Sequence, residues 1–455
     1  MQTIYKFVYG EIYKITKHIS ERVRSLCIFV CCLIFFTGFF TDRAGRMNSI
    51  SNDMIFGTTM VIITSVFSID KDPGKIRWNR WIYLSMVAFG TGMLLVGQLH
   101  YVGIGYMLYA LDLMLVLPAF YYIQVSTDSS ERISRILSLT IVIAGIISYV
   151  YTWIQAAQGQ LPELLAGRFF GYFSNPNGLG MVGVVVLIAG LYLTIKSHNK
   201  WVHVLSAAAA GIGVDYALLS ASRSAVMCGI VCVTSFLIFL VKRRKAGGST
   251  SLNIKKIIVC ILIAAAVMTA GTKIEDLNLK EKPQDEASVG INDNDNNPSE
   301  KESDEVPLTD RPGVSDGMHN FTSGRVDIWM VYINHFSWLG IDVRELVDHF
   351  GEGTAYRAHN NFIDYTVRCG YIVGFLYLIF YIAIGIKGLM ILFCRKHIRP
   401  EDFLFVSVIG AYSIQALVEV ATLPFTRIIP CMFFLTIAPL MGRSEDTETG
   451  DALEK

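Results

Sequence analysis

The sequence predicts an all-α, polytopic integral membrane protein with about twelve transmembrane helices and one large external loop between helices 9 and 10. Hydrophobic residues make up 53% of the 455 residues and charged residues only 17%, a balance too apolar for a soluble globular protein. The apolar residues gather into runs long enough to cross a bilayer, and one polar stretch at 271–360 interrupts them. These observations define the fold class.

The first 25 residues are predicted to form an interfacial amphipathic helix on the cytoplasmic surface. Apolar residues recur there at helical spacing, and the lysines lie elsewhere on the helix. No small-residue cleavage site follows the apolar run at 26–41, so we interpret this run as the first span rather than a signal peptide.

Transmembrane helices 1–9 are assigned to 26–270 and helices 10–12 to 361–441, before a tail at 442–455. The apolar runs behind this assignment are 26–41, 54–69, 81–97, 101–125, 133–154, 178–195, 202–220, 224–241, 254–270, 362–386, 403–420 and 427–441. An even number of spans places both termini on one side.

The distribution of lysine and arginine predicts the orientation. The termini and the connections on their side hold 24 basic residues, whereas the short loops on the other side hold five. Because cytoplasmic loops are enriched in basic residues, both termini are predicted to be cytoplasmic and the 271–360 loop external.

Charge and cysteine usage narrow the partners. The net charge is +1 and the basic residues are dispersed, which argues against a nucleic-acid partner. The nine cysteines all lie in or beside apolar runs, which indicates neither a disulfide framework nor a zinc site. We expect no metal and no other cofactor.

The external loop divides into two parts. Residues 275–320 are predicted to be largely disordered, because 275–310 carries twelve acidic residues and little apolar content. Residues 322–360 are predicted to be ordered and catalytic. Five apolar residues follow a Thr322/Ser323 cap at helical spacing and place Arg325 in the first turn of a helix: Val326, Trp329, Met330, Ile333 and Phe336.

Ionisable residues within or beside the spans are candidates for function, since each costs roughly 2.5 to 3.5 kcal/mol at mid-helix. Those predicted in the external half are Asp112, Asp215, Arg223, Asp364, Arg368 and Glu419. Asp364 and Arg368 are four residues apart, and we expect them to form a structural pair. Asp112 and Asp215 could likewise be satisfied by hydrogen-bonding groups on neighbouring helices.

Arg223 is the basic residue at a span edge that best fits a phosphate. It follows serines that open a predicted helix, where free backbone N–H groups and the helix dipole favour an anion. The alternative is an arginine that merely extends to the membrane surface. Upstream lies Arg168, and Asn175 and Asn177 flank Pro176, where they can cap the next helix or bind sugar hydroxyls.

Four motifs in order resemble the O-antigen ligase and O-antigen polymerase superfamily of bacterial membrane glycosyltransferases. They are GRFFGYFSNPNGLG (167–180), LLSASRSA (218–225), SGRVDIW (323–329) and AHNNF (358–362), with Gly370 and Gly374 after them. The chain departs from this pattern after the loop helix, where Trp338-Leu-Gly340-Ile-Asp342 replaces a frequent Gly-x-Gly turn. The acceptor side is therefore expected to be remodelled.

The resemblance implies a metal-independent enzyme of the bacterial cytoplasmic (inner) membrane that acts on the external face. Its donor would be a glycan on undecaprenyl pyrophosphate and its acceptor a sugar hydroxyl. Arg223 and Arg325 match the pyrophosphate-binding arginines, and His359 matches the essential loop histidine. The residues expected to contact substrate are Arg168, Asn175, Asn177, Arg357 and Asn360.

These roles are chemically reasonable. Two arginines can stabilise the departing pyrophosphate in place of a divalent ion. His359 precedes the tenth span, whose N-terminal dipole disfavours the imidazolium, as does Arg357, and this keeps a neutral base for the acceptor hydroxyl. A helix cap or a solvated loop residue is the alternative for His359.

The sequence favours polymerisation of surface-polysaccharide repeat units (O-antigen, capsule or exopolysaccharide) over ligation. The external loop offers one compact segment and no second folded domain for a large foreign acceptor. A ligase that attaches finished glycan to a lipid, wall or protein acceptor stays open. So do a lipid-linked sugar flippase or transporter and a binding scaffold. Membrane lipids and other polysaccharide-assembly proteins are the expected partners.

Overall fold

The computed structural model describes residues 2–41, 50–99, 104–160, 168–171, 173, 175–245, 259–271, 325–342, 358–395, 398–419 and 423–444. These residues are almost entirely helical, which confirms the all-α prediction for the described part of the chain. The exception is a small antiparallel sheet in which β1 (Ile76–Trp78) pairs with β2 (Gly442–Ser444). The predicted tether, the Thr322/Ser323 cap and Arg357 lie outside the described residues.

The helices follow the predicted runs closely. In chain order they are α1 (Gln2–Thr16), α2 (Glu21–Thr41), α3 (Ile50–Ser68), α4 (Arg80–Leu99), α5 (Ile104–Leu111), the π-helix η1 (Asp112–Val116), α6 (Leu117–Ser126), α7 (Ser130–Ala157), α8 (Pro176–Lys196), α9 (Lys200–Leu219), α10 (Arg223–Lys245), α13 (Arg325–Asn334), α15 (Asn361–Cys394), α16 (Pro400–Val418), α17 (Ile428–Thr436) and α18 (Ala438–Met441).

Eight of the twelve predicted spans coincide with helices of the described residues that are long and apolar enough to cross a membrane. These are Glu21–Phe40, Ile104–Ser126, Ser130–Ala157, Pro176–Lys196, Lys200–Leu219, Arg223–Lys245, Asn361–Cys394 and Pro400–Val418. Two further apolar helices, Arg80–Val96 and Val259–Gly271, are shorter. The chain is therefore helical and of membrane type.

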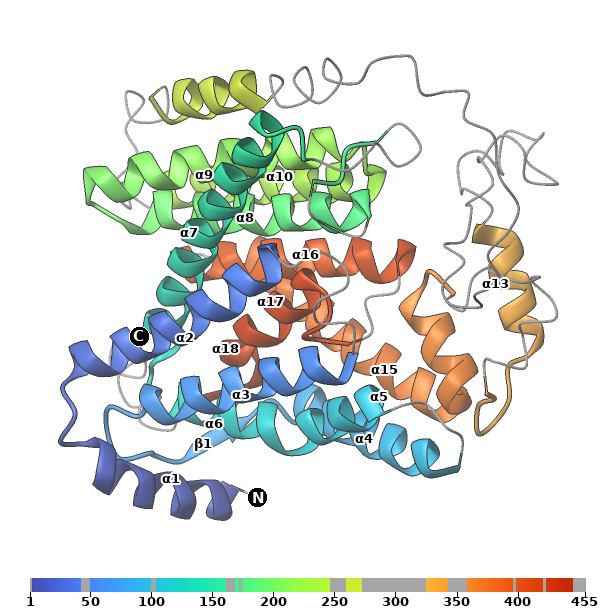
Figure 1. Cartoon of the computed structure of the whole chain (residues 1–455). Coiled ribbons are helices and arrows are strands. Elements are labelled where there is room, and N and C mark those ends of the chain that lie inside the picture. Colours follow the sequence, from blue (N-terminus) through green and yellow to red (C-terminus); the bar gives the residue numbers. More distant parts are fainter. Residues whose placement is uncertain are drawn as a thin grey trace, which may run out of the picture.

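The predicted twelfth span, 427–441, is two short helices. Nine residues of α17 extend about 14 Å, which is less than the ~30 Å hydrocarbon core. Every residue of α17 is buried, and α17 lies among α2, α15 and α16 (Figure 1). This segment fills the centre of the bundle, which explains why its sequence reads as a continuous apolar run.

The helices form layers in which α8, α9, α10 and α16 run in roughly the same direction, whereas α7 crosses them obliquely (Figure 1). On one side α7, α8, α9 and α10 pack together, and on the other α3, α4, α5 and α6 lie side by side with α1 outside them. The exposed side chains of α1 include the apolar Ile4, Phe7 and Ile15, whereas its tyrosines face the protein. An outward apolar face is what an interfacial helix presents to lipid.

Polar contacts tie together the connections that carry most of the basic residues. Lys196 Nζ lies 2.6 Å from Glu131 and 2.9 Å from Glu401, and Arg395 Nη1 lies 2.7 Å from Asp402. These residues come from the ends of α7, α8, α15 and α16. The connections that the lysine and arginine count groups together thus meet at one end of the bundle.

At the other end, α15 is broken and docked by the segment that follows α13. Gly370 has φ 83° inside α15, a left-handed conformation that glycine adopts without steric cost. The break exposes backbone groups, and the 337–341 segment binds them: Ile341 N–H donates to Val367 (2.8 Å) and Tyr371 N–H donates to Ser337 (3.0 Å). Gly340, with φ 80°, faces this break.

The packing face of α13 differs from the predicted stripe. Trp329 and Phe336 do pack against the start of α15, but together with Ile328 and the fully buried Tyr332. Three members of the predicted stripe point outward: Val326, Met330 and Ile333. The predicted stripe is displaced from the packing face of α13, because Tyr332, which the prediction left out, lies at the centre of that face.

Candidate functional site

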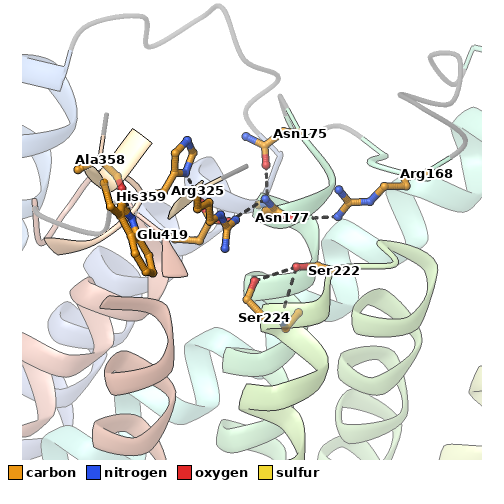
Figure 2. A network of polar contacts seen from close by, with 12 residues as sticks. Arg168, Asn175, Asn177, Ser222, Ser224, Arg325, Ala358, His359 and Glu419 are labelled. Carbon is orange, nitrogen blue, oxygen red and sulfur yellow. Dashed lines mark hydrogen bonds and ion pairs between the residues drawn. The ribbon is translucent and has the colours of Figure 1, made fainter. Parts of the chain in front are cut away.

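A cluster of polar side chains surrounds Glu419, the residue that follows α16 (Figure 2). Arg325 Nη2, from the first turn of α13, donates to Glu419 Oε1 at 2.8 Å. Asn177 Nδ2, from the first turn of α8, donates to the same oxygen at 3.0 Å. Glu419 therefore joins two motifs that lie about 150 residues apart in the chain.

The cluster extends from Asn177 to Arg168. Arg168 Nη2 donates to Asn177 Oδ1 at 2.9 Å, and its Nε donates to the backbone oxygen of Ser220 at 2.9 Å. Ser220 ends α9, so this arginine fastens the segment before α8 to the α9–α10 corner. Three of the four sequence motifs are thereby joined.

Two asparagines act as helix caps, which for Asn175 is one of the two predicted alternatives. Asn175 Oδ1 accepts from Gly178 N–H at 2.9 Å and starts α8, while Asn360 Oδ1 accepts from Ile363 N–H at 3.1 Å and starts α15. Asn360 Nδ2 also donates to the Leu417 carbonyl at 3.2 Å. This bond holds the start of α15 against the end of α16.

His359 completes the cluster from the fourth motif. Its Nδ1 lies 3.5 Å from Glu419 Oε2, and its side chain is 34% exposed, compared with 15% for Glu419. With Nδ1 directed at the carboxylate, Nε2 is the ring nitrogen left to accept a proton. Trp329 Nε1 donates to the preceding carbonyl, of Ala358, at 2.7 Å and so fixes the backbone that carries the histidine.

The backbone of His359 is itself strained. Its φ of +50° lies in the left-handed region, which is uncommon for residues other than glycine. Such conformations cost of order 1 to 3 kcal/mol and persist where the surroundings enforce them. The Asn360 cap on one side and the Trp329 bond on the other supply that enforcement.

The cationic surroundings keep Glu419 ionised. Burial of Glu419 opposes its charged form, but the contact with His359 and the positive charge of Arg325 outweigh burial, so the net pKa of Glu419 is lowered from its usual value. This carboxylate lies 3.5 Å from His359 Nδ1. Glu419 thus adds a negative charge beside His359, whereas the prediction from sequence took account only of the helix dipole and Arg357.

Arg223 begins α10 as predicted, beside the same corner. The side chain is exposed, whereas the flanking Ser222 and Ser224 are buried and share a 3.1 Å hydroxyl contact. Gly180 of α8 permits this corner to approach, because a Cβ there would lie 2.6 Å from Ser220 Oγ. Arg223 thus stands at the end of the bundle that holds Arg168, which reaches Glu419 through Asn177.

The site residues predicted from sequence have four outcomes. Arg168, Asn177, Arg325 and His359 are linked through Glu419, while Asn175 and Asn360 serve as caps at the same end. Arg223 lies beside them at the α9–α10 corner. Arg357 falls outside the described residues.

Glu419 is the residue whose role the sequence analysis missed. It was noted as an ionisable group near a span, but no motif includes it. Its position directly after a long apolar helix was the available signal, since a carboxylate there is costly without a cationic partner.

The other ionisable residues have the structural roles expected of them. Arg368 Nε donates to Asp364 at 3.0 Å, and Thr58 donates to Asp112 at 2.9 and 3.0 Å. Tyr149 donates to Asp215 at 3.2 Å. Each of these carboxylates therefore accepts a hydrogen bond from a neighbouring side chain.

Arg168 and Arg325 bring two positive charges to a cluster in which Glu419 supplies one negative charge. A guanidinium has five N–H donors, and Glu419 accepts from one nitrogen of Arg325. The cluster can therefore bind an anionic group with charge-assisted hydrogen bonds and offer a nearby imidazole for proton transfer.

No model of a known protein family matches the chain, and a search of curated proteins gives no match.

Proposed function

We propose that this chain is a bacterial cytoplasmic-membrane glycosyltransferase that moves a glycan from undecaprenyl pyrophosphate to an acceptor sugar hydroxyl at the external face, and that it polymerises polysaccharide repeat units. In this proposal the protein spans the membrane about twelve times, with α17 and α18 together making the last crossing and both termini in the cytoplasm. The large loop that contributes Arg325 and His359 is external.

The convergence on Glu419 is the observation that carries the proposal. Four segments that resemble one superfamily in sequence meet at one end of the helical bundle, and they bring arginines beside a histidine. Structural packing alone explains neither the surplus of positive charge nor the strained histidine. A site for a phosphorylated substrate accounts for both.

The proposed reaction assigns each residue one task. The acceptor oxygen forms a bond to the anomeric carbon, the bond from this carbon to the pyrophosphate oxygen breaks, and the acceptor proton passes to His359 Nε2. Glu419 stabilises the resulting imidazolium. Arg325, Arg223 and Arg168 stabilise the charge that develops on the departing lipid pyrophosphate.

The direct test is turnover by the purified full-length chain in detergent. Given only lipid-linked repeat units, a polymerase produces a ladder of lengthening chains. Transfer that occurs only after a distinct lipid, wall or protein acceptor is added would replace the polymerase with a ligase. Absence of transfer in both arms, with translocation of lipid-linked sugar in proteoliposomes, would identify a flippase and overturn the enzymatic proposal.

A further inference from the structure

A second candidate site lies at the opposite end of the bundle. A cleft of about 830 Å³ opens between α2, α7 and the α8–α9 turn. It is remote from the polar cluster because α16 runs from Glu401, which contacts Lys196 at the rim of this cleft, to Glu419. The cleft takes no part in the proposed glycan transfer.

The lining of the cleft is divided between cationic and apolar groups. Arg22 and Arg135 line it near the helix ends, while Leu26, Phe29 and Leu139 line it farther along α2 and α7. Arg22, Leu26 and Phe29 share one helical face at i, i+4 and i+7. Charge therefore gives way to apolar surface in the direction in which these helices enter the hydrophobic layer.

The acidic residues nearby pair with other cations. Glu21 lies 3.6 Å from Arg132, and Lys196 lies 2.6 Å from Glu131 and 2.9 Å from Glu401. In the part of the chain that the structure describes, Arg22 and Arg135 take part in no hydrogen bond or ion pair, and both are exposed. The cleft thus offers two arginines to an anion.

We propose that this cleft binds an anionic phospholipid, with the phosphate at Arg22 and Arg135 and the acyl chains along Leu26, Phe29 and Leu139. Basic pockets between transmembrane helices hold lipid head groups in this way. The exposed Leu26 continues the apolar outer surface of α2, which gives the acyl chains a path into the bilayer. A free phosphate would use the arginines but not the apolar wall.

The test measures phosphatidylglycerol retained by the purified full-length chain in native mass spectrometry. Each arginine contributes roughly fivefold to association with an anionic membrane surface, so Arg22→Gln with Arg135→Gln should lower affinity by about 25-fold. Arg244→Gln with Lys245→Gln removes two exposed cations of the α10 end that do not line the cleft, and should retain the lipid.

A second variant separates a lipid from a free anion and guards against misfolding. Leu26→Trp leaves both arginines in place and fills the apolar part from an exposed position, so it should lose phosphatidylglycerol. Equal retention by the wild type and the double arginine variant would overturn the proposal. So would saturable binding of inorganic phosphate that competes with phosphatidylglycerol and is unchanged in Leu26→Trp.

Discussion

At the scale of single residues, Glu419 determines how the polar cluster is arranged. Its two oxygens separate the guanidinium and amide on one side from the imidazole on the other. Removal of this carboxylate leaves Arg325 and Asn177 without their acceptor, and a buried donor without an acceptor costs about 1 to 3 kcal/mol. Glu419 therefore links stability to the proposed chemistry.

We expect Glu419→Gln to lower both the melting temperature and the rate of glycan transfer, because the amide keeps an acceptor but loses the charge. The folded-state pKa of Glu419 is below the ordinary value of 4.5, so its stabilising contribution is present above about pH 4.5 and is lost as the pH falls through the folded pKa. The difference in melting temperature between wild type and variant should shrink on acidification. Glu11→Gln, at an exposed pair with Lys14, is the matched control and should change stability little.

Arg223→Ala and Arg325→Ala should each weaken use of the lipid-linked donor by about 2 kcal/mol, because each removes a charge-assisted contact to pyrophosphate. Lysine should restore little, since it lacks the planar fork. The quantity to measure is kcat/KM for the lipid-linked donor. Normal donor use by a folded Arg223→Ala protein would exclude Arg223 from the pyrophosphate site.

His359 has to be tested without disturbing its left-handed backbone. Asparagine tolerates positive φ but cannot act as a base, so His359→Asn should fold and lose about 10² to 10⁴ in transfer rate. The melting temperature of this variant should stay close to that of the wild type. Transfer at near-normal rate would refute the assignment of His359 as the general base.

At the scale of elements, the break in α15 decides how the loop helix α13 is positioned. Gly370 and Gly340 face each other with positive φ, and a Cβ on either would meet the backbone of the other segment. The 337–341 segment follows α13 directly, so its contact with α15 fixes the position of α13 and of Arg325 in the first turn of that helix. The segment from Trp338 to Asp342 makes this contact.

Gly370→Ala should therefore destabilise the protein by about 2 kcal/mol or more, through both positive φ and the clash with Trp338 backbone. Transfer should fall with it, as Arg325 loses its position. Gly385→Ala is the matched control in the same helix, because a Cβ there meets nothing within 4 Å. Equal melting temperatures for the two variants would show that the break is not sterically required.

At the scale of the whole molecule, the sequence predicts architecture better than it predicts contacts. Hydropathy located the eight membrane-length helices of the described residues, because the bilayer imposes length and composition on each one. Hydropathy could not distinguish a lipid-facing span from the buried α17, since both are uniformly apolar. Glu419 and the Gly340–Gly370 contact were hidden because each depends on segments that are brought together only by the fold.

The orientation of the molecule is open to chemical labelling. In a background without native cysteines, Ser303→Cys should react with an impermeant maleimide in intact cells, because the lysine and arginine distribution places 271–360 outside. His198→Cys, at the end that carries the phospholipid cleft, should react only after lysis. The reverse pattern would invert the proposed topology.

The place of α17 and α18 in the centre of the bundle has a consequence for biogenesis. These helices follow the other described helices in the chain, yet they fill the interior against which those helices pack. The bundle therefore lacks part of its interior until α17 and α18 have been synthesised, and a nonsense mutation just before α17 would yield an inserted but incompletely packed protein. Cellular quality control could therefore recognise an incomplete protein by the interior surface that α17 and α18 would otherwise cover.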